Sequence, residues 1–113
     1  MLAITETVDQ VFVITIEEGR LDAALAPEFE QQMKHWLADG NRNILIDFKN
    51  VDFMDSTGLG ALVACLKALG SPRQLILCNV SVKIKSLFKL TRMDRIFVIY
   101  RTRSEALKNF SPQ

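Results

Sequence analysis

The chain has 113 residues, of which 49% are hydrophobic and 24% are charged, and its formal net charge is +1. A chain of this length and composition typically forms one domain, so we expect a single domain over residues 1–113, frayed from about residue 111. Positive and negative charges are interspersed, which argues against nucleic acid as a partner. No apolar run approaches the roughly 20 residues of a membrane helix, and the first ten residues do not resemble a signal peptide. We therefore expect a cytoplasmic protein that does not insert into a membrane.

The side chains that commonly bind metals are few and widely spaced. Cys65 and Cys78 both lie in apolar segments, where two buried free thiols are more common than a disulfide, and this favours a reducing compartment. His35 is the only histidine, and the chain has no Cys/His spacing typical of a metal site. We therefore expect no metal site and no cofactor.

The N-terminal residues predict a hairpin. Residues 2–7 alternate in the manner of a short edge strand, and Asp9 and Gln10 favour a turn. Residues 11–16 are almost continuously apolar and rich in β-branched side chains, which indicates a second strand. Two neighbouring strands joined by a tight turn suggest an antiparallel pair.

A helix is predicted next, over residues 27–39. Pro27 is well placed in a first helical turn, and apolar residues recur at helical spacing until Gly40, which favours a C-terminal stop. His35 lies off the apolar stripe, so we interpret it as a solvated surface side chain.

The central segment predicts a buried strand and a second helix. Residues 44–48 form a short apolar run typical of a strand covered on both faces. Apolar residues then recur at helical spacing from Leu59 to Leu69, and residues 70–72 favour the end of that helix. One flank of the helix carries the small residues Ala61, Ala64, Cys65 and Ala68. Either the helix packs closely on the sheet, which we favour because exposed apolar patches are uncommon on monomers, or part of this flank meets a partner.

The C-terminal part predicts two more strand–helix units. Residues 75–78 read as a buried strand, and Ser81 is a plausible N-cap for a helix through Leu90. The outer face of that helix is basic because it carries Lys83, Lys85 and Lys89, and such a run is usually only a solvated face. Residues 96–100 indicate the last strand, and the capping-box spacing of residues 102–105 predicts a C-terminal helix reaching Leu107 and Phe110.

From about residue 11 the order strand–helix occurs four times. Helices between strands act as crossovers, which require neighbouring strands to run parallel. We therefore predict an α/β fold with a mixed, mostly parallel sheet covered by helices and a short N-terminal antiparallel hairpin.

The stretch Asp55-Ser56-Thr57-Gly58-Leu59-Gly60 stands where a strand leads into a helix. The first N–H groups of a helix have no intrahelical partner, and the macrodipole makes that end partly positive. Residues there cap the helix, bind an anion or carry a covalently attached one. Capping by Asp55 or Ser56, with the glycines packed on the sheet, would alone explain most such stretches. Gly58 and Gly60 cost about 1 kcal/mol each relative to Ala, which would be tolerated if a partner's backbone must approach closely.

The residues of this stretch argue against an enzyme. A serine nucleophile needs a nearby general base, but the only histidine lies on another predicted helix and Ser56 is not in a G-x-S-x-G elbow. The glycines also lack the third glycine and the lysine of a phosphate-binding loop. We therefore interpret Ser56 as an acceptor of a phosphoryl group, whose oxygens a helix N-terminus favours although the Asp55 carboxylate repels them.

Four motifs resemble one bacterial family. Residues 53–60 resemble the signature of the anti-sigma factor antagonists, the single-domain members of the STAS group, and residues 19–22 resemble its G-x-L-D turn. Residues 77–81 and 90–97 resemble its last strand–helix–strand segments. Each motif alone is weak, but four in the same order over nearly the whole chain are specific. The family often has Gly at the position of Arg92, where a left-handed backbone would cost Arg about 1–2 kcal/mol.

The resemblance implies a STAS-like fold and a partner-switching function. The unmodified protein would bind an anti-sigma factor that is also a serine kinase and thereby free a sigma factor. That kinase would phosphorylate Ser56, with Thr57 as the runner-up acceptor, and a PP2C-type phosphatase would reverse the modification. The partner-binding residues that the resemblance implies are Asp22, Asp55, Ser56, Thr57, Gly58, Leu59 and Gly60.

Two other functions stay open at this point. The chain is alternatively a STAS interaction module that works without a kinase, in a transporter-associated or scaffold complex, with Ser56 mainly structural. A small nucleotide-binding module is a third hypothesis, which we rank lower because no basic residue lies near the glycines in the sequence. Asp22 is alternatively an ordinary turn aspartate.

Overall fold

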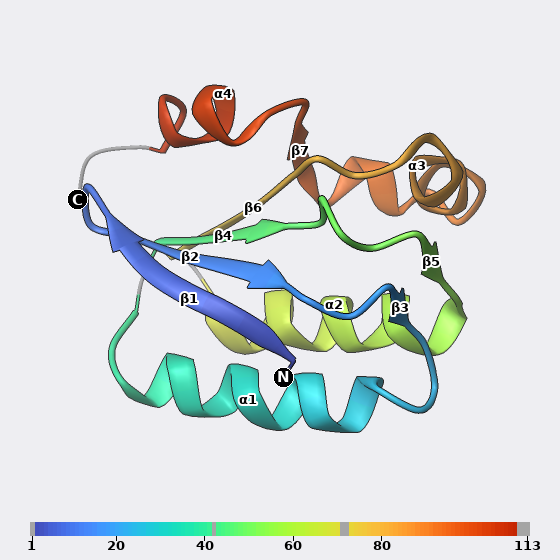
Figure 1. The fold of residues 1–113 in the computed structure, drawn as a ribbon, viewed down its shortest axis with the longest axis horizontal. Helices are drawn as coiled ribbons and strands as arrows, with labels where there is room; N and C mark the ends of the chain where they lie inside the picture. Colours follow the sequence, from blue (N-terminus) through green and yellow to red (C-terminus); the bar gives the residue numbers. More distant parts are fainter. Residues whose placement is uncertain (1, 42, 71–72, 111–113) are drawn as a thin grey trace.

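The computed structural model describes residues 2–41, 43–70 and 73–110, which form a five-stranded mixed sheet in the order β1-β2-β4-β6-β7 (Figure 1). Its strands are β1 (Ala3–Val8), β2 (Val11–Ile16), β4 (Asn43–Asp47), β6 (Gln74–Cys78) and β7 (Val98–Tyr100). β1 is antiparallel to β2, and the pairs β2–β4, β4–β6 and β6–β7 are parallel. The helices are α1 (Ala26–Ala38), α2 (Ser56–Leu69), α3 (Val82–Leu90) and α4 (Arg103–Leu107). The predicted α/β fold with a mostly parallel sheet is confirmed.

The predicted N-terminal hairpin is formed by β1 and β2. Asp9 and Gln10 connect the two strands with φ angles of 50° and 69°, and Val8 pairs with Val11. Positive φ at both central residues is typical of the two-residue turn that matches the twist of a hairpin. The turn therefore sets the register that brings the apolar strand β2 into the sheet beside β4.

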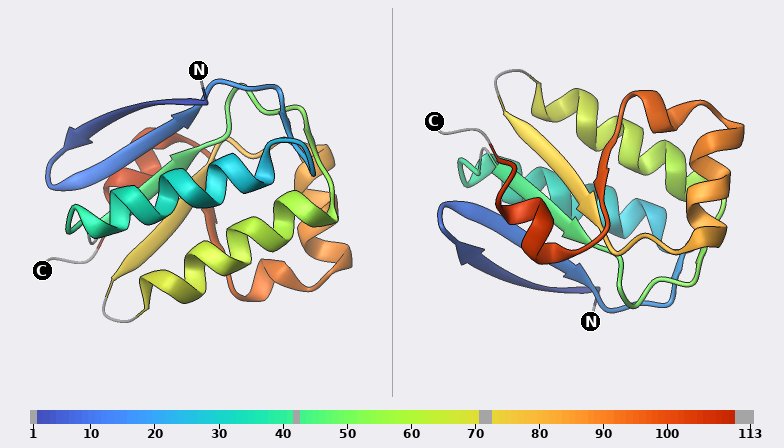
Figure 2. Two further views of the ribbon diagram at one scale, coloured as in Figure 1. Left: turned by 90° about the horizontal axis from the view of Figure 1, so that it is seen from below. Right: turned by 90° about the horizontal axis from the view of Figure 1, so that it is seen from above.

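Helices cover both faces of the sheet. α1 and α2 lie side by side on one face, and α4 lies on the opposite face (Figures 1 and 2). Along β4 the side chains alternate between the two cores, since Ile44 and Ile46 join the larger one and Leu45 joins the smaller one. The smaller core packs against Ala106 of α4. Burial on both faces explains why the predicted strands are nearly continuous apolar runs.

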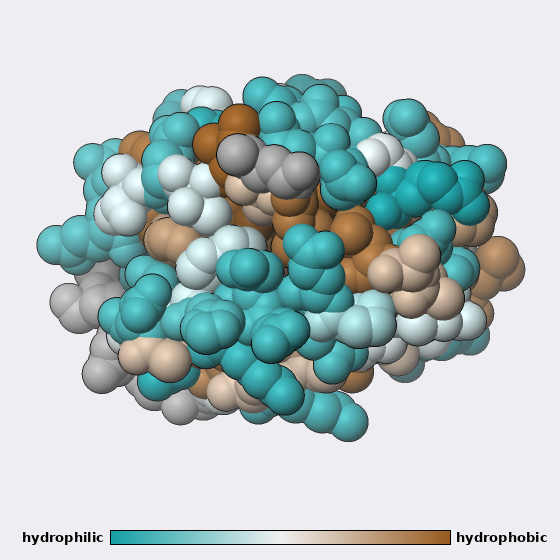
Figure 3. Space-filling model, turned by 60° about the horizontal axis from the view of Figure 1, so that its bottom comes forward, coloured by the Kyte–Doolittle hydropathy of each residue, from teal (hydrophilic) through white to brown (hydrophobic). Residues whose placement is uncertain are grey.

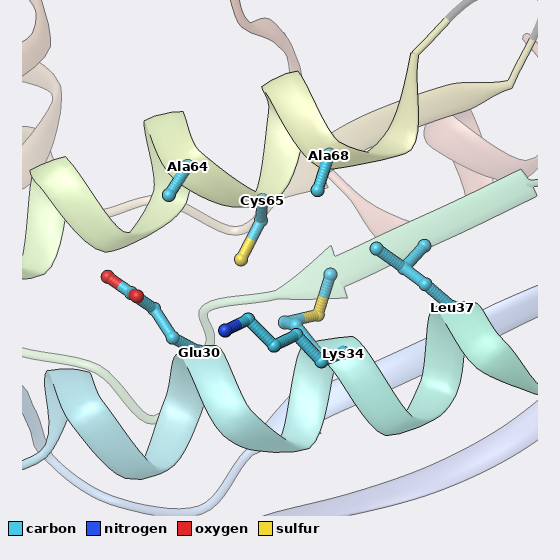
Figure 4. Close-up of a pocket in the computed structure, with 7 residues that line it drawn as sticks. Glu30, Lys34, Leu37, Ala64, Cys65 and Ala68 are labelled. Carbon is cyan, nitrogen blue, oxygen red and sulfur yellow. The ribbon is translucent and has the colours of Figure 1, made fainter.

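The small-residue flank of α2 faces α1. Ala64, Cys65 and Ala68 line a narrow, mostly apolar gap between the two helices together with Met33 and Leu37 of α1 (Figure 4). Cys65 is 4% exposed, and burial raises the pKa of its thiol to about 12, so the thiol stays protonated at neutral pH. Figure 3 shows hydrophobic side chains near the centre of this side of the molecule, surrounded by hydrophilic ones. Ala61 and Cys65 are therefore packed within the fold, with Cys65 against α1 and not on the sheet as predicted, whereas Ala64 and Ala68 are exposed and leave the partner alternative open.

α4 is anchored to the sheet by a polar cluster. The Arg103 guanidinium donates to the Thr15 hydroxyl at 3.2 Å and lies 3.6 Å from the carboxylate of Asp47, which is 2% exposed. Asp47 also accepts hydrogen bonds from the Lys49 N–H at 2.9 Å and from the Asn79 amide at 3.0 Å. A buried charge needs such partners, because an unpaired one is costly in a medium of low polarity.

The last strand is shorter than the sequence predicted. It begins at Val98, whereas the prediction began at residue 96. A 3₁₀ turn, η1 (Met93–Arg95), precedes it, and the N–H of Phe97 donates to the Met93 carbonyl at 3.1 Å. Phe97 packs edge-on against Phe88 of α3, with ring centroids 5.5 Å apart. The apolar character of residues 96 and 97 therefore reflects core packing and exposure in a turn, and not strand pairing.

The C-terminal helix is also shorter than predicted. The Thr102 hydroxyl caps it by accepting from the Glu105 N–H at 3.1 Å, as the capping-box spacing indicated. The helix ends at Leu107, and the Asn109 side chain donates to the Glu105 carbonyl at 2.8 Å, which satisfies a carbonyl of the last turn. Phe110 packs against the smaller core from beyond the helix.

Two expectations fall on residues outside the described ranges, namely the contribution of Ser71 and Pro72 to the end of a helix and the fraying of residues 111–113. Within the described chain, α2 ends at Leu69 and Gly70 follows with φ 65°. No helix within the described residues combines the length and the apolar character that crossing a bilayer requires.

Arg92, between α3 and η1, has a strained backbone conformation. Its φ of 65° and ψ of 15° place it in the left-handed region, as the resemblance had suggested, and such a conformation costs a non-glycine residue about 1–2 kcal/mol. Glycine relieves this strain, but it also makes the unfolded chain more flexible, which lowers the free energy of unfolding by about 0.4–1 kcal/mol. We expect Arg92→Gly to raise the free energy of unfolding, measured in urea, by about 0.5–1 kcal/mol.

Arg95→Gly is the matched control, since Arg95 is exposed in η1 and is not among the residues with positive φ. This change is expected to lower the free energy of unfolding by about 0.5–1 kcal/mol through the entropy of glycine alone. A loss of stability in Arg92→Gly as large as in the control would contradict the strained backbone at position 92.

Candidate functional site

Two short strands that the sequence did not reveal hold the candidate site together. β3 (Arg20–Leu21) and β5 (Phe53–Met54) form a separate two-stranded parallel sheet beside the N-terminal end of α2 (Figure 1). Leu21 and Met54 are buried, whereas Arg20 lies on the other face with its guanidinium 4.1 Å from the centre of the Phe53 ring. The pairing brings the turn after β3 against the start of α2.

Asp55 caps α2 and also binds the turn after β3. One carboxylate oxygen accepts the Gly58 N–H at 2.9 Å, and the other accepts the Ala23 N–H at 3.3 Å. The residue has extended backbone angles, as N-cap residues usually do. Of the two caps that the sequence left open, Asp55 is therefore the one used, and Ser56 is the first residue of the helix.

Asp22 organises the turn that Asp55 holds. One of its oxygens accepts the N–H groups of Ala24 and Leu25 at 3.2 and 3.3 Å, and the other accepts the Arg20 Nε–H at 3.2 Å. The hydrogen bond from Arg20 is the largest influence that holds the pKa of Asp22 below its ordinary value, and the two backbone N–H groups act in the same direction. Asp22 is therefore a charged carboxylate in a fixed position, with 22% of its side chain exposed.

The glycines of the stretch differ from each other. A Cβ on Gly58 would overlap the Leu21 carbonyl oxygen and lie 2.9 Å from its carbon, so only glycine lets α2 approach β3 this closely. A Cβ on Gly60 would meet nothing within 4 Å. Gly58 and Leu59 are buried, so neither offers side-chain surface to a partner. The close approach at Gly58 is made within the chain itself.

Ser56 and Thr57 are exposed at the N-terminal end of α2. The N–H groups of Gly58 and Leu59 are occupied by Asp55, through its side chain and its carbonyl respectively. The N–H groups of Ser56 and Thr57 donate to no group that the structure describes. These two donors therefore stay available to an anion attached to this turn.

The site contains no described arrangement for covalent catalysis. The Ser56 hydroxyl forms no hydrogen bond with any described side chain, and a serine nucleophile needs a base within that reach. His35 is exposed on α1, as predicted. Among the described residues there is also no group of three or more His, Cys, Asp or Glu side chains able to hold a metal ion.

Two cations lie near the site although the sequence did not predict them there. Arg20 stacks on Phe53 with 63% of its side chain exposed, and the Lys83 ammonium group lies 5.8 Å from the centre of the same ring. Nothing in the local sequence places residues 20, 53 and 83 together, because the contact depends on strand pairing and on the packing of α3 against β5. The alternation of Arg20 and Asp22 around the buried Leu21 is the only local signal of a shared face.

Comparisons with known proteins agree with the fold and with the family that the sequence resembles. The STAS domain family profile matches residues 3–106. An anti-sigma-B factor antagonist of Staphylococcus aureus is 39% identical over 88 residues, which cover 77% of this chain and 81% of that protein. An anti-sigma factor antagonist of Mycobacterium paratuberculosis has a similar structure, with a TM-score of 0.86, 29% identity and coverage of 94% of this chain and 90% of that chain. Phosphorylated SpoIIAA of Bacillus shares the fold, with a TM-score of 0.70, 23% identity and coverage of 94% and 96%.

Substitution of the two glycines tests the close approach of α2 to β3. Gly58→Ala is expected to lower the free energy of unfolding, measured in urea, by roughly 2–3 kcal/mol because the methyl group displaces the backbone of Leu21. Gly60→Ala is the control in the same helix and is expected to raise stability by about 0.5–1 kcal/mol, since it meets open space and favours the helix. Equal stability of the two variants would contradict the geometry.

Proposed function

Since this chain belongs to the anti-sigma factor antagonists of the STAS domain family, we propose that its unmodified form binds a kinase-type anti-sigma factor and thereby releases a sigma factor. Phosphorylation of Ser56 by that kinase ends binding, and a PP2C-type phosphatase restores it. The observation that carries the proposal is the exposed Ser56 at the N-terminal end of α2, next to a separate residue that caps the helix. Because the proposed kinase uses ATP, the cycle takes place in the cytoplasm.

Asp55 caps the helix and leaves the Ser56 hydroxyl free, which supports a modification site at Ser56. Because Asp55 caps the helix, the Ser56 hydroxyl has no structural role that a phosphate would remove. The first-turn N–H groups of Ser56 and Thr57 and the positive end of the helix favour phosphate oxygens, which offsets repulsion from the Asp55 carboxylate. The unphosphorylated and phosphorylated forms of SpoIIAA match this fold equally well, in line with a modification that leaves the scaffold unchanged.

The surface around Ser56 explains how a phosphate would end binding. Asp22 and Asp55 already present carboxylates there, and a phosphate adds about −1.5 to −2 further charges at neutral pH. The added group also occupies the space over the first turn of α2 that a closely bound partner would use. A partner that recognises Asp22 through a hydrogen bond therefore loses both fit and charge balance, and like charges brought together cost binding energy.

Ser56 rather than Thr57 is the proposed acceptor. Incubation with the kinase and ATP is expected to add one phosphate to the wild-type chain, observed by intact-protein mass spectrometry. Ser56→Ala is expected to remain unmodified, whereas Thr57→Ala, the matched control at the neighbouring exposed hydroxyl, is expected to be modified like the wild type. Full modification of Ser56→Ala would contradict the assignment.

A charge at position 56 is expected to weaken binding without the kinase reaction. Ser56→Asp introduces one negative charge beside Asp55, so its affinity for the anti-sigma factor is expected to fall about tenfold, measured by isothermal titration calorimetry. Ser56→Asn is the control of similar size and is expected to bind more tightly than Ser56→Asp. Equal affinity of the aspartate variant and the wild type would contradict charge at position 56 as the signal.

A further inference from the structure

The outward face of α3 carries two large apolar side chains that the fold does not use. Ile84 and Phe88 are buried and hold the helix on the protein, whereas Val82 and Leu90 are 81% and 83% exposed. At 100° per residue, Ser86 lies between Val82 and Leu90 on the side of the helix opposite the buried pair. Single exposed apolar residues are ordinary, but two on the same side of one helix mark a candidate surface with apolar residues at both of its ends.

The charges of α3 frame this apolar pair. The helix contains three lysines and no acidic residue. On the helical projection, Lys85 and Lys89 lie on one side of Val82, Ser86 and Leu90, and Lys83 lies on the other side. Leu90, Ser86 and Lys89 also line a surface hollow. The face therefore offers an apolar centre with a cationic rim, the composition that interface centres and rims commonly show.

The N-terminal end of α3 adjoins the short strands that hold the Ser56 site. α3 packs against β5, and Lys83 lies 5.8 Å from the centre of the Phe53 ring on which Arg20 stacks. Arg20 in turn holds Asp22. A partner bound over Ser56 and Asp22 is therefore next to the N-terminal end of α3 and can extend along it.

We infer that this α3 face, made of Val82, Lys83, Ser86, Lys89 and Leu90, is a second docking surface for the anti-sigma factor, which meets it with apolar residues flanked by carboxylates. The inference rests on the proposed function, since it assigns further contacts to the same partner. Phosphorylation of Ser56 leaves the α3 face unchanged. The α3 face selects the partner, and Ser56 switches the binding.

The chemistry of the face favours a protein partner over nucleic acid. The lysines of α3 flank two exposed apolar side chains, whereas nucleic acid is bound mainly through cations that contact its phosphates. An acidic and apolar protein surface matches both parts of the face at once.

Isothermal titration calorimetry with the purified kinase and the unmodified chain tests the apolar part. Leu90→Ser is expected to weaken binding about tenfold, because it removes an apolar contact at a side chain that the free fold leaves exposed. Ile4→Ser is the matched control, since Ile4 is 50% exposed on β1, and it is expected to bind like the wild type. Urea unfolding of each variant checks that the fold is retained.

Charge reversal tests the cationic rim. Lys89→Glu is expected to weaken binding about tenfold at low salt, with a smaller effect at high salt because ions screen exposed charges. Lys108→Glu makes the same charge change at the exposed end of α4 and is expected to bind like the wild type. Two further measurements compare the wild type with Leu90→Ser. Binding to anionic phospholipid vesicles tests for a lipid surface, and sedimentation of the free chain tests for dimer formation.

Three results would overturn the inference. Wild-type affinity of both Leu90→Ser and Lys89→Glu would show that the partner does not touch α3. Vesicle binding or dimer formation that Leu90→Ser abolishes, with binding to the kinase unchanged, would assign the face to a lipid surface or to a second copy. No binding of the wild type would end the proposed function and this inference together. Kinase binding could also be kept in Ser56→Asp but lost in Leu90→Ser. That result would contradict the switch at Ser56 and would support the α3 face as a docking surface.

Discussion

Two backbone N–H groups from distant parts of the chain, those of Ala23 and Gly58, donate to the carboxylate of Asp55. One bond caps α2 and the other holds the turn after β3, so a single side chain connects the two segments. The absence of a Cβ at Gly58 allows the Leu21 carbonyl to lie against the helix at the same point. The position of Ser56 depends on these contacts, because they fix where the first turn of α2 begins and leave its own hydroxyl free.

The larger sheet brings the parts of the site to one end of the molecule. β3, β5 and α3 follow β2, β4 and β6 along the chain, and those three strands run parallel. Segments that leave the carboxyl ends of neighbouring parallel strands meet at one edge of a sheet, where ligand sites of such folds commonly form. The turn with Asp22, the loop before Ser56 and the start of α3 therefore adjoin, although more than 50 residues separate the first from the last.

The sequence predicted what depends on local pattern. Runs of apolar residues gave the strands and helices, Ser81 and Thr102 were recognised as caps, and the strand–helix alternation implied a parallel sheet. Contacts between segments could not be predicted in this way. The pairing of Arg20 with Phe53 involves two residues on each strand, too few for a periodic signal, and the apolar residues 96 and 97 resembled a strand although they lie in a turn. The candidate site follows the same rule. The helix start before Ser56 was visible in the sequence, but only the structure shows that Asp55 is the cap and that an internal contact requires Gly58.

Binding of the purified anti-sigma factor to two forms of this chain, unmodified and stoichiometrically phosphorylated at Ser56, tests the central claim most directly. The phosphorylated form is expected to bind at least about 100-fold more weakly, while its free energy of unfolding stays within about 1 kcal/mol of that of the unmodified form. That result would show that a charge on an intact scaffold controls binding. Equal affinity of the two forms, or unfolding of the phosphorylated chain, would contradict the account.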